Sequence, residues 1–160
     1  MKRLIAGLLL TCAFAGCATP NRLVYSSGFS FANYDYVVIA KSDGKDLTTS
    51  LYGMDVDFAN LVSRYGMKVI GDKEYQKLPP DMQQRTLNAR ISITAGNKRI
   101  ILAVSFDDST TGRPGSSITA FTKGDIFDLD DRTEAFETAS ITLVKALRQD
   151  KRLQVTDEKK

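Results

Sequence analysis

The segment Tyr34–Ala40 constrains the fold more than any other part of this 160-residue chain. It reads Tyr-Asp-Tyr-Val-Val-Ile-Ala, with aromatic and β-branched residues and an apolar centre that no polar residue interrupts. A strand with one face in water alternates apolar and polar residues, so the unbroken run predicts a strand covered on both faces. We therefore expect this strand to lie centrally in a sheet.

A helix and a second strand follow this segment. Ser42–Asp46 has the composition of a turn, and Thr48, Thr49 or Ser50 can cap a helix. Apolar residues then recur at helical spacing on one face. They are Leu51, Met54, Phe58, Leu61, Val62 and Tyr65. A glycine ends the helix and the short strand Met67–Ile70 follows, which makes a β-α-β unit with an expected parallel, right-handed crossover.

Three further strands are predicted after a loop. Residues 72–84 contain two consecutive prolines and are expected to form a loop with short helical turns. The alternating or β-branched strand segments are Leu87–Thr94, Arg99–Asp107 and Ser117–Lys123, joined by turns at Ala95–Lys98 and Asp108–Gly115. Short turns predict an antiparallel arrangement of these three strands.

The last periodic segment predicts an amphipathic helix that starts at Asp131. Asp131 and Glu134 have the spacing of a capping box, with Asp in place of Ser or Thr. The apolar stripe of this helix is Phe136, Ala139, Leu143, Val144 and Leu147. The order is therefore β-α-β-β-β-β-α, which predicts an α+β (mixed α/β) domain whose mixed, mainly antiparallel sheet is packed by two amphipathic helices.

The N-terminus has the pattern of a secretory signal. Two cations precede an apolar run over residues 4–16, which is shorter than the about 20 residues that a membrane span needs. Phe14-Ala15-Gly16-Cys17 resembles the lipobox of bacterial lipoproteins, although Phe14 stands where the family usually has an aliphatic residue. The alternative is an ordinary secretion signal in which Cys17 has no special role.

The lipoprotein resemblance implies that Cys17 becomes the lipid-modified first residue of the mature protein. Ala18, in place of an Asp after the Cys, implies sorting to the outer membrane, with the domain facing the periplasm; another membrane-anchored or a secreted location is the alternative. The expected organisation is a signal peptide over 1–16, a lipidated N-terminus and flexible tether over 17–30, one domain over 31–149 and a charged tail over 150–160.

Composition excludes several kinds of active site. The chain contains no histidine, so it has no Ser-His-Asp triad, no Cys-His pair and no His-ligated metal. If Cys17 is acylated, the mature domain has no free thiol, because Cys12 lies in the signal. Removing Lys2 and Arg3 takes 22 basic residues to 20 against 19 acidic, a net charge of +1. This balance gives no reason to expect a nucleic-acid partner, and no cofactor is expected.

Acidic and glycine-rich segments are candidate sites, but each has a simpler structural explanation. An acidic cluster near the last helix could hold Ca²⁺, although helix capping explains it without a metal; its members are Asp125, Asp128, Asp130, Asp131 and Glu134. Asp107 and Asp108 could act as catalytic carboxylates, although Asp is common in turns. Gly112–Ser117 lacks the lysine and the helix of a phosphate loop. We expect no catalytic residue and no metal site.

The element order resembles the small α/β domains of bacterial periplasmic lipoproteins. The features that carry the resemblance are Tyr36–Ile39, the long helix, the short strand after a glycine and the Asp108–Gly112 turn. Families with such domains include the curli secretion lipoprotein CsgG, the activator LpoB and the amino-terminal domain of TolB. The resemblance spans residues 34–147 and implies the fold. A CsgG-type pore is not expected, because no pair of long alternating segments could build membrane-spanning hairpins.

These observations predict a non-catalytic lipoprotein that binds another envelope protein or supports envelope assembly. Its membrane contact is the anchor at Cys17, and the candidate partner surface consists of Tyr34, Asp108, Thr111, Gly112 and Arg113. The alternative is a module that binds a small molecule or glycan, or a hydrolase that uses carboxylates. A pocket with converging carboxylates would favour the alternative, and a flat apolar patch or an open sheet edge would favour the partner role.

Overall fold

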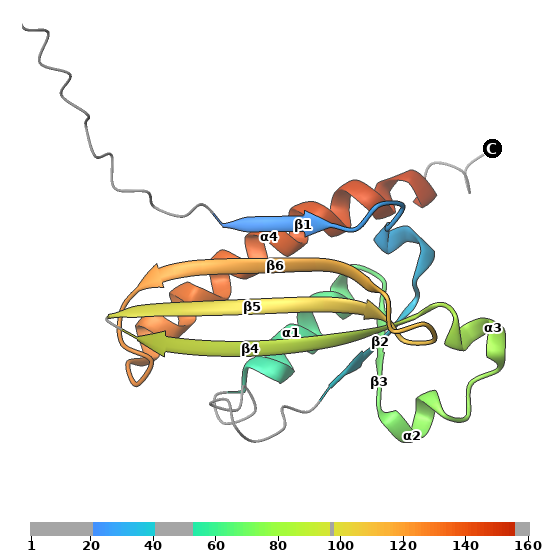
Figure 1. The fold of residues 1–160 in the computed structure, drawn as a ribbon, viewed down its shortest axis with the longest axis horizontal. Coiled ribbons are helices and arrows are strands. Elements are labelled where there is room, and N and C mark those ends of the chain that lie inside the picture. The colour runs from blue at the N-terminus through green and yellow to red at the C-terminus, as the bar shows by residue number, and fades with distance from the viewer. Residues whose placement is uncertain (1–20, 41–52, 97, 156–160) are drawn as a thin grey trace, which may run out of the picture.

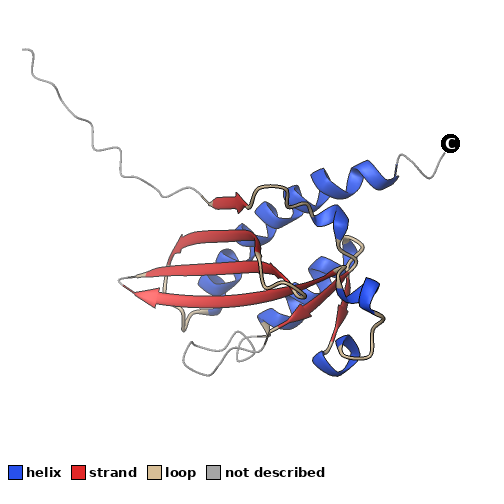
Figure 2. Ribbon diagram, turned by 45° about the vertical axis from the view of Figure 1, so that its right-hand side comes forward, coloured by secondary structure: helices blue, strands red, loops and turns tan. Residues whose placement is uncertain are grey.

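Six strands form a single sheet in the computed structural model, which describes residues 21–40, 53–96 and 98–155 (Figures 1 and 2). The strands are β1 Arg22–Tyr25, β2 Tyr36–Ile39, β3 Lys68–Ile70, β4 Thr86–Gly96, β5 Arg99–Asp108 and β6 Pro114–Lys123. Their order in the sheet is β1-β6-β5-β4-β2-β3. β2 pairs in parallel with β3 and β4, and the other pairs are antiparallel. The predicted α+β class with a mixed, mainly antiparallel sheet is confirmed.

Two long helices cover one face of this sheet (Figure 2). They are α1, Met54–Arg64, and α4, Leu129–Val155. The short helices α2, Asp72–Tyr75, and α3, Pro80–Gln83, lie in the segment between β3 and β4, as predicted from its prolines. A single 3-10 turn, η1, covers Phe31–Asn33. No described helix is both long enough and apolar enough to cross a lipid bilayer.

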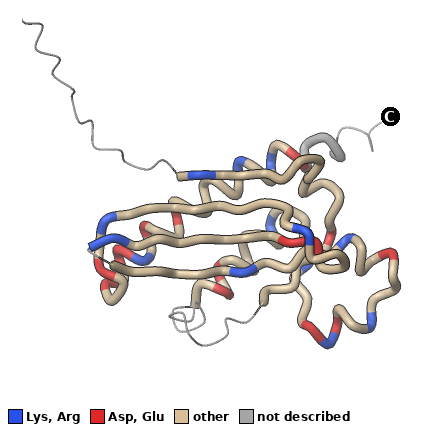
Figure 3. The backbone as a smooth tube through the Cα atoms, in the orientation of Figure 1, with Lys and Arg blue, Asp and Glu red and all other residues tan. Residues whose placement is uncertain are grey.

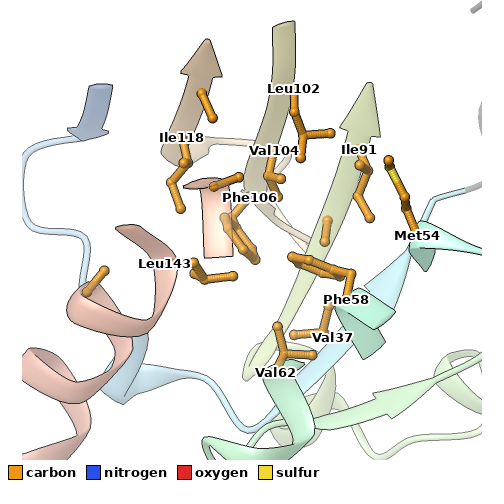
Figure 4. Close-up of a cluster of buried hydrophobic side chains, with 14 of the residues drawn as sticks. Val37, Met54, Phe58, Val62, Ile91, Leu102, Val104, Phe106, Ile118 and Leu143 are labelled. Carbon is orange, nitrogen blue, oxygen red and sulfur yellow. The ribbon is translucent and has the colours of Figure 1, made fainter. Parts of the chain in front are cut away.

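The core lies between the sheet and the two long helices. Alternate residues of β4, β5 and β6 point to this side and are at most 4% exposed: Leu87, Ala89, Ile91, Ile93, Ile100, Leu102, Val104, Phe106, Ile118 and Ala120. They meet Phe58 and Val62 of α1 and Leu143 of α4 (Figure 4). The alternation in the sequence therefore identifies the buried face of the central hairpins.

β2 is buried on both faces, as its unbroken apolar run predicts. Val37 is 0% and Val38 4% exposed, although successive residues of a strand point to opposite sides. α3 lies beside the start of β4, where the Thr86 hydroxyl donates a hydrogen bond of 2.9 Å to the Met82 carbonyl. β2 lies between β4 and β3, and so is an interior strand.

β1 lies inside the segment 17–30 that the sequence analysis assigned to a flexible tether. Arg22–Tyr25 pairs with β6, so that Arg22 lies opposite Thr119 and Tyr25 opposite Ser116. The Ser26 amide extends this ladder by donating to the Gly115 carbonyl at 2.8 Å. A four-residue run has too little periodicity to be recognised in sequence, and the partner that makes it a strand is the edge of β6. The tether assignment is wrong for these four residues.

The cap of α4 lies three residues before the predicted one, Asp131. The Asp128 carboxylate caps the helix by accepting hydrogen bonds from the amides of the second and third helical residues at 2.8 and 3.3 Å. Asp131 is the acidic residue three positions after the cap, and its carboxylate accepts the Asp125 amide at 2.7 Å. The predicted start at Asp131, paired with Glu134, is therefore wrong, and the cap is Asp128.

α4 also extends into the predicted charged tail 150–160, because it continues to Val155. The Asp150 carboxylate accepts the Phe31 amide at 2.8 Å and the Ser30 hydroxyl at 3.2 Å, which joins this part of the helix to η1. At the other long helix, the cap of α1 is Gly53, with φ +69°. The predicted caps Thr48, Thr49 and Ser50 lie outside the described residues, as does Leu51.

We expect β1 to stabilise the domain, so a chain that starts at Phe29 should fold but unfold at lower urea concentration than one that starts at Asn21. The shorter chain loses the β1–β6 ladder and the contact of the Tyr25 and Phe31 rings, whose centroids are 6.1 Å apart. Together these losses correspond to about 2 kcal/mol of unfolding free energy. Far-UV circular dichroism of both chains in urea measures the difference. Equal midpoints would contradict a stabilising β1, and a disordered longer chain would contradict the domain itself.

Candidate functional site

A row of aromatic rings joins the N-terminal segment to the core. Phe31 is fully buried, and its ring meets Phe29 and Phe106 edge to face at centroid distances of 4.9 and 5.0 Å. At one end of the row Tyr25 contacts Phe31 at a centroid distance of 6.1 Å, and at the other end Phe58 contacts Phe106 at 5.9 Å. Edge-to-face pairs are favourable arrangements of aromatic rings. Phe31, Phe58 and Phe106 thus belong to the core, and Phe29 packs against it.

Tyr34 continues this row toward the turn between β5 and β6. Its ring stacks on Phe29 at a centroid distance of 5.6 Å, and its hydroxyl donates a hydrogen bond of 3.1 Å to one carboxylate oxygen of Asp108. Tyr34 and Asp108 are half-buried. The two residues are 74 positions apart, and the sheet brings them together.

The other oxygen of Asp108 organises the β5–β6 turn. It accepts the Thr111 amide at 2.7 Å, the Thr111 hydroxyl at 2.9 Å and the Thr110 amide at 3.1 Å. Gly112 has φ +66°, a left-handed conformation that glycine adopts without strain, and its amide donates to the Asp108 carbonyl at 2.8 Å. The predicted Asp-x-x-Thr-Gly turn is confirmed, and these hydrogen bonds are its cause.

The turn is fixed to the scaffold beneath it. Ser109 donates its amide to the Thr86 carbonyl at 3.1 Å and its hydroxyl to the Gln83 carbonyl at 3.0 Å. Gly115 allows Phe29 to lie directly against β6, because a Cβ atom there would come within 2.3 Å of the Phe29 ring. Thr111, Gly112 and Arg113 are consequently exposed on a turn that is held from both sides.

Hydrogen bonds and burial set the protonation states of Asp108 and Tyr34. Burial raises the pKa of Asp108, but the hydrogen bonds from Thr111, Tyr34 and Thr110 outweigh it and hold that pKa below its ordinary value. Burial, followed by the negative charge and the hydrogen bond of Asp108, raises the pKa of Tyr34. At neutral pH the site is therefore a carboxylate that accepts a hydrogen bond from a neutral phenol.

The structure assembles the five residues predicted as a partner surface at one end of the sheet. Tyr34 lies beside the turn that contains Asp108, Thr111, Gly112 and Arg113, and we call these five residues the turn site. Their role in binding stays a prediction. Sequence reasoning missed the part of Ser109, whose contacts with residues 83 and 86 no local motif signals. Cys17 lies outside the described residues.

The acidic cluster before α4 serves local structure. Asp128 caps the helix, Asp131 accepts the Asp125 amide, and Asp125 in turn accepts the Phe127 amide at 3.0 Å. Within the described ranges, no group of three or more acidic or other metal-binding side chains is gathered as a cation site would require. Only Asp128 caps α4, while Asp125 and Asp131 accept amides of the loop before the helix.

Three hollows in the described part of the chain lie between and beside α1 and α4. The largest of these three, about 430 Å³, is an open depression along α4, lined by Glu137, Ser140, Ile141, Val144, Lys145 and Arg148. A shallow groove of about 250 Å³ runs between the two helices, lined by Asp57, Asn60, Leu61, Arg64, Phe136, Glu137 and Ser140. Beneath it, an apolar void of about 10 Å³ reaches the sheet at Leu102 and Val104. The buried Ser140 hydroxyl has no hydrogen-bond partner there. None of these three hollows is lined by Asp107 or Asp108, so none gathers the predicted carboxylates.

The chain matches no family model and no curated protein sequence. Solved structures that resemble it include two PelC dodecamers from Paraburkholderia phytofirmans. One, a point variant, is 15% identical with a TM-score of 0.47, over 76% of this chain and 95% of that one. The other is 14% identical with a TM-score of 0.45, over 74% and 95%. A lipoprotein from Neisseria meningitidis, GNA1162, is 12% identical with a TM-score of 0.41, over 69% and 96%.

We expect Asp108→Asn to destabilise the domain at neutral pH, by about 1 kcal/mol, because charge-assisted hydrogen bonds become neutral ones. Since the folded-state pKa of Asp108 is below its ordinary value, the contribution of the carboxylate is complete above the unfolded pKa and is lost as pH falls through the folded one. The difference between wild type and variant should therefore shrink below about pH 4.

Urea unfolding of both proteins at a series of pH values measures this effect. Asp107→Asn is the matched control, because Asp107 is the neighbouring half-buried residue of the same strand. A difference that stays constant between neutral and acidic pH would contradict the role of the Asp108 charge.

Proposed function

We propose that this chain is a lipid-anchored protein of the bacterial envelope that binds a protein partner and catalyses no reaction. The observation that carries the proposal is the lipobox-like segment Phe14–Cys17, which precedes the first strand of the domain by only a few residues. Several acyl chains on one cysteine are enough for stable attachment without help from the protein surface. Ala18 after the cysteine supports the outer membrane, with the domain in the periplasm.

The turn site is the surface that we propose for the partner. Exposed turns on a rigid scaffold are common binding elements, and Asp108, Ser109 and Gly115 hold this turn in one conformation. A surface that is already ordered loses little conformational entropy when a partner binds. The turn also lies at the end of the sheet opposite to the point where the N-terminal segment enters (Figure 1). A partner could therefore reach it without meeting the membrane.

The hydrogen bonds of Asp108 support a binding role over a hydrolytic one. Both of its carboxylate oxygens already accept hydrogen bonds from the turn or from Tyr34. A general acid needs a raised pKa near the working pH, and the pKa of Asp108 is lowered. The carboxylate is thus suited to holding the turn.

The anchor is tested by Cys17→Ser in cells of a bacterium that lipidates exported proteins. We expect this variant to incorporate no labelled palmitate and to leave the membrane fraction, because the acyl chains supply the attachment. Cys12→Ser is the matched control, since it changes the other cysteine of the chain within the apolar run. It should remain labelled and bound. Labelling and membrane binding that persist in Cys17→Ser would rule out the anchor.

The partner surface is tested by placing a photo-crosslinking amino acid at Thr111 or Arg113 in the same cells. We expect each position to give a crosslinked product that contains a second envelope protein. Ile141, which is 57% exposed on α4, is the control position and should give no such product. Crosslinks from Ile141 alone would place the partner on α4 and contradict the turn site.

A further inference from the structure

The N-terminal segment enters the sheet beside one particular end of the domain. The Phe121 amide donates a hydrogen bond of 3.4 Å to the Asn21 side chain, and Lys123 of the same strand lies opposite Arg99. This end consists of the β4–β5 hairpin and the loop from β6 to α4 (Figure 1). The Gly124 amide joins the two by donating to the Lys98 carbonyl at 3.0 Å. We call it the hairpin end.

The position of Cys17 limits how far the hairpin end can be from a membrane. Asn21 follows Cys17 by four positions, and four residue steps span at most about 14 Å. From Phe121 to Lys123 the strand rises about 7 Å more toward the hairpin end. β6 as a whole, Pro114–Lys123, is about 30 Å long. An acylated Cys17 therefore holds the hairpin end near the lipid, with the turn site at the far end.

The hairpin end presents the two most exposed large apolar side chains of the described residues. Phe127 is 77% and Leu129 is 65% exposed; Leu129 is the first residue of α4, and Phe127 lies in the loop before it. Ile126 beside them is 3% exposed and packs in the core, and the Phe127 amide is held by Asp125. The loop is thus fixed in a conformation that points Phe127 outward. Aromatic and leucine side chains on such a surface suit the boundary between headgroups and acyl chains.

Charged side chains at this end are compatible with a lipid surface. Lys98, Arg99 and Lys123 are exposed there, and neither salt bridge among the described residues involves them (Figure 3). Cations at this position can contact lipid phosphates. The nearby carboxylates Asp125 and Asp128 accept backbone amides at the start of α4, where the helix dipole favours negative charge. Since this end carries both cations and carboxylates, we assign the main contact with lipid to the apolar side chains Phe127 and Leu129.

We infer that Phe127 and Leu129 insert into the headgroup region of the membrane that holds the Cys17 lipid, so that the domain stands on its hairpin end. This inference rests on the proposed lipid anchor and adds a second, non-covalent contact with the same membrane. It assigns the orientation of the domain, with the turn site directed away from the lipid surface.

The experiment uses the absence of tryptophan from the chain. Phe127→Trp then carries a single fluorescent reporter at the hairpin end, and Leu129→Trp is a second reporter in case the first disturbs the loop. Thr110→Trp, at an exposed position of the β5–β6 turn, is the matched control. Each lipidated protein is reconstituted in phosphatidylcholine–phosphatidylglycerol vesicles in which the phospholipid carries bromine on its acyl chains.

We expect brominated lipid to quench Phe127→Trp and Leu129→Trp and to leave Thr110→Trp unchanged. A protein that carries no lipid on Cys17 and does not float with the vesicles would remove the proposed anchor and this inference with it. A lipidated protein that floats while neither hairpin-end reporter is quenched overturns the orientation alone. Equal quenching of Thr110→Trp, or a blue shift of the Phe127→Trp emission without quenching, also overturns it, because the domain then lies flat or a protein covers Phe127.

Discussion

The edge-to-face contact between Phe31 and Phe106 is the interaction on which the placement of the N-terminal segment depends. Phe31 is fully buried against β5, and its amide is held by Asp150 of α4. Segments from the two ends of the chain and the centre of the sheet therefore meet at one residue. Burial, together with the charge of Asp150, raises the pKa of Tyr25 to about 12, so the Tyr25 phenol stays neutral beside Phe31. β1 and Tyr34 take their positions on either side of this contact.

Hydrophobic periodicity predicts the parts of the fold that bury a regular face. The double burial of β2, the alternation of β4 and β5, and the apolar stripe of α1 follow directly from residue spacing. β1 and the last turns of α4 could not be predicted in this way, because contacts with residues far away in the sequence stabilise them. Arg22–Tyr25 becomes a strand through the edge of β6, and Asp150 is held by η1. Tertiary contacts of this kind leave no local pattern.

The turn site was predictable only in its local part. Asp108, Thr111 and Gly112 form a turn whose side-chain chemistry can be read from their spacing, because the hydrogen bonds among these three residues are between near neighbours. The contact of Asp108 with Tyr34 depends on the order of the strands, which the sequence does not state. The same limit explains the misplaced cap of α4. Several acids near that helix can act as caps, and the local sequence does not distinguish Asp128 from the others.

The position of β1 has a mechanical consequence for a domain anchored through Cys17. Tension on the anchor enters the fold along β1, whose hydrogen bonds to β6 are perpendicular to the strand. A pull along the strand loads these bonds together in shear, whereas a pull across it would open them one after another. In a domain anchored in this way, β1 would bear tension from the anchor before the aromatic cluster behind it does.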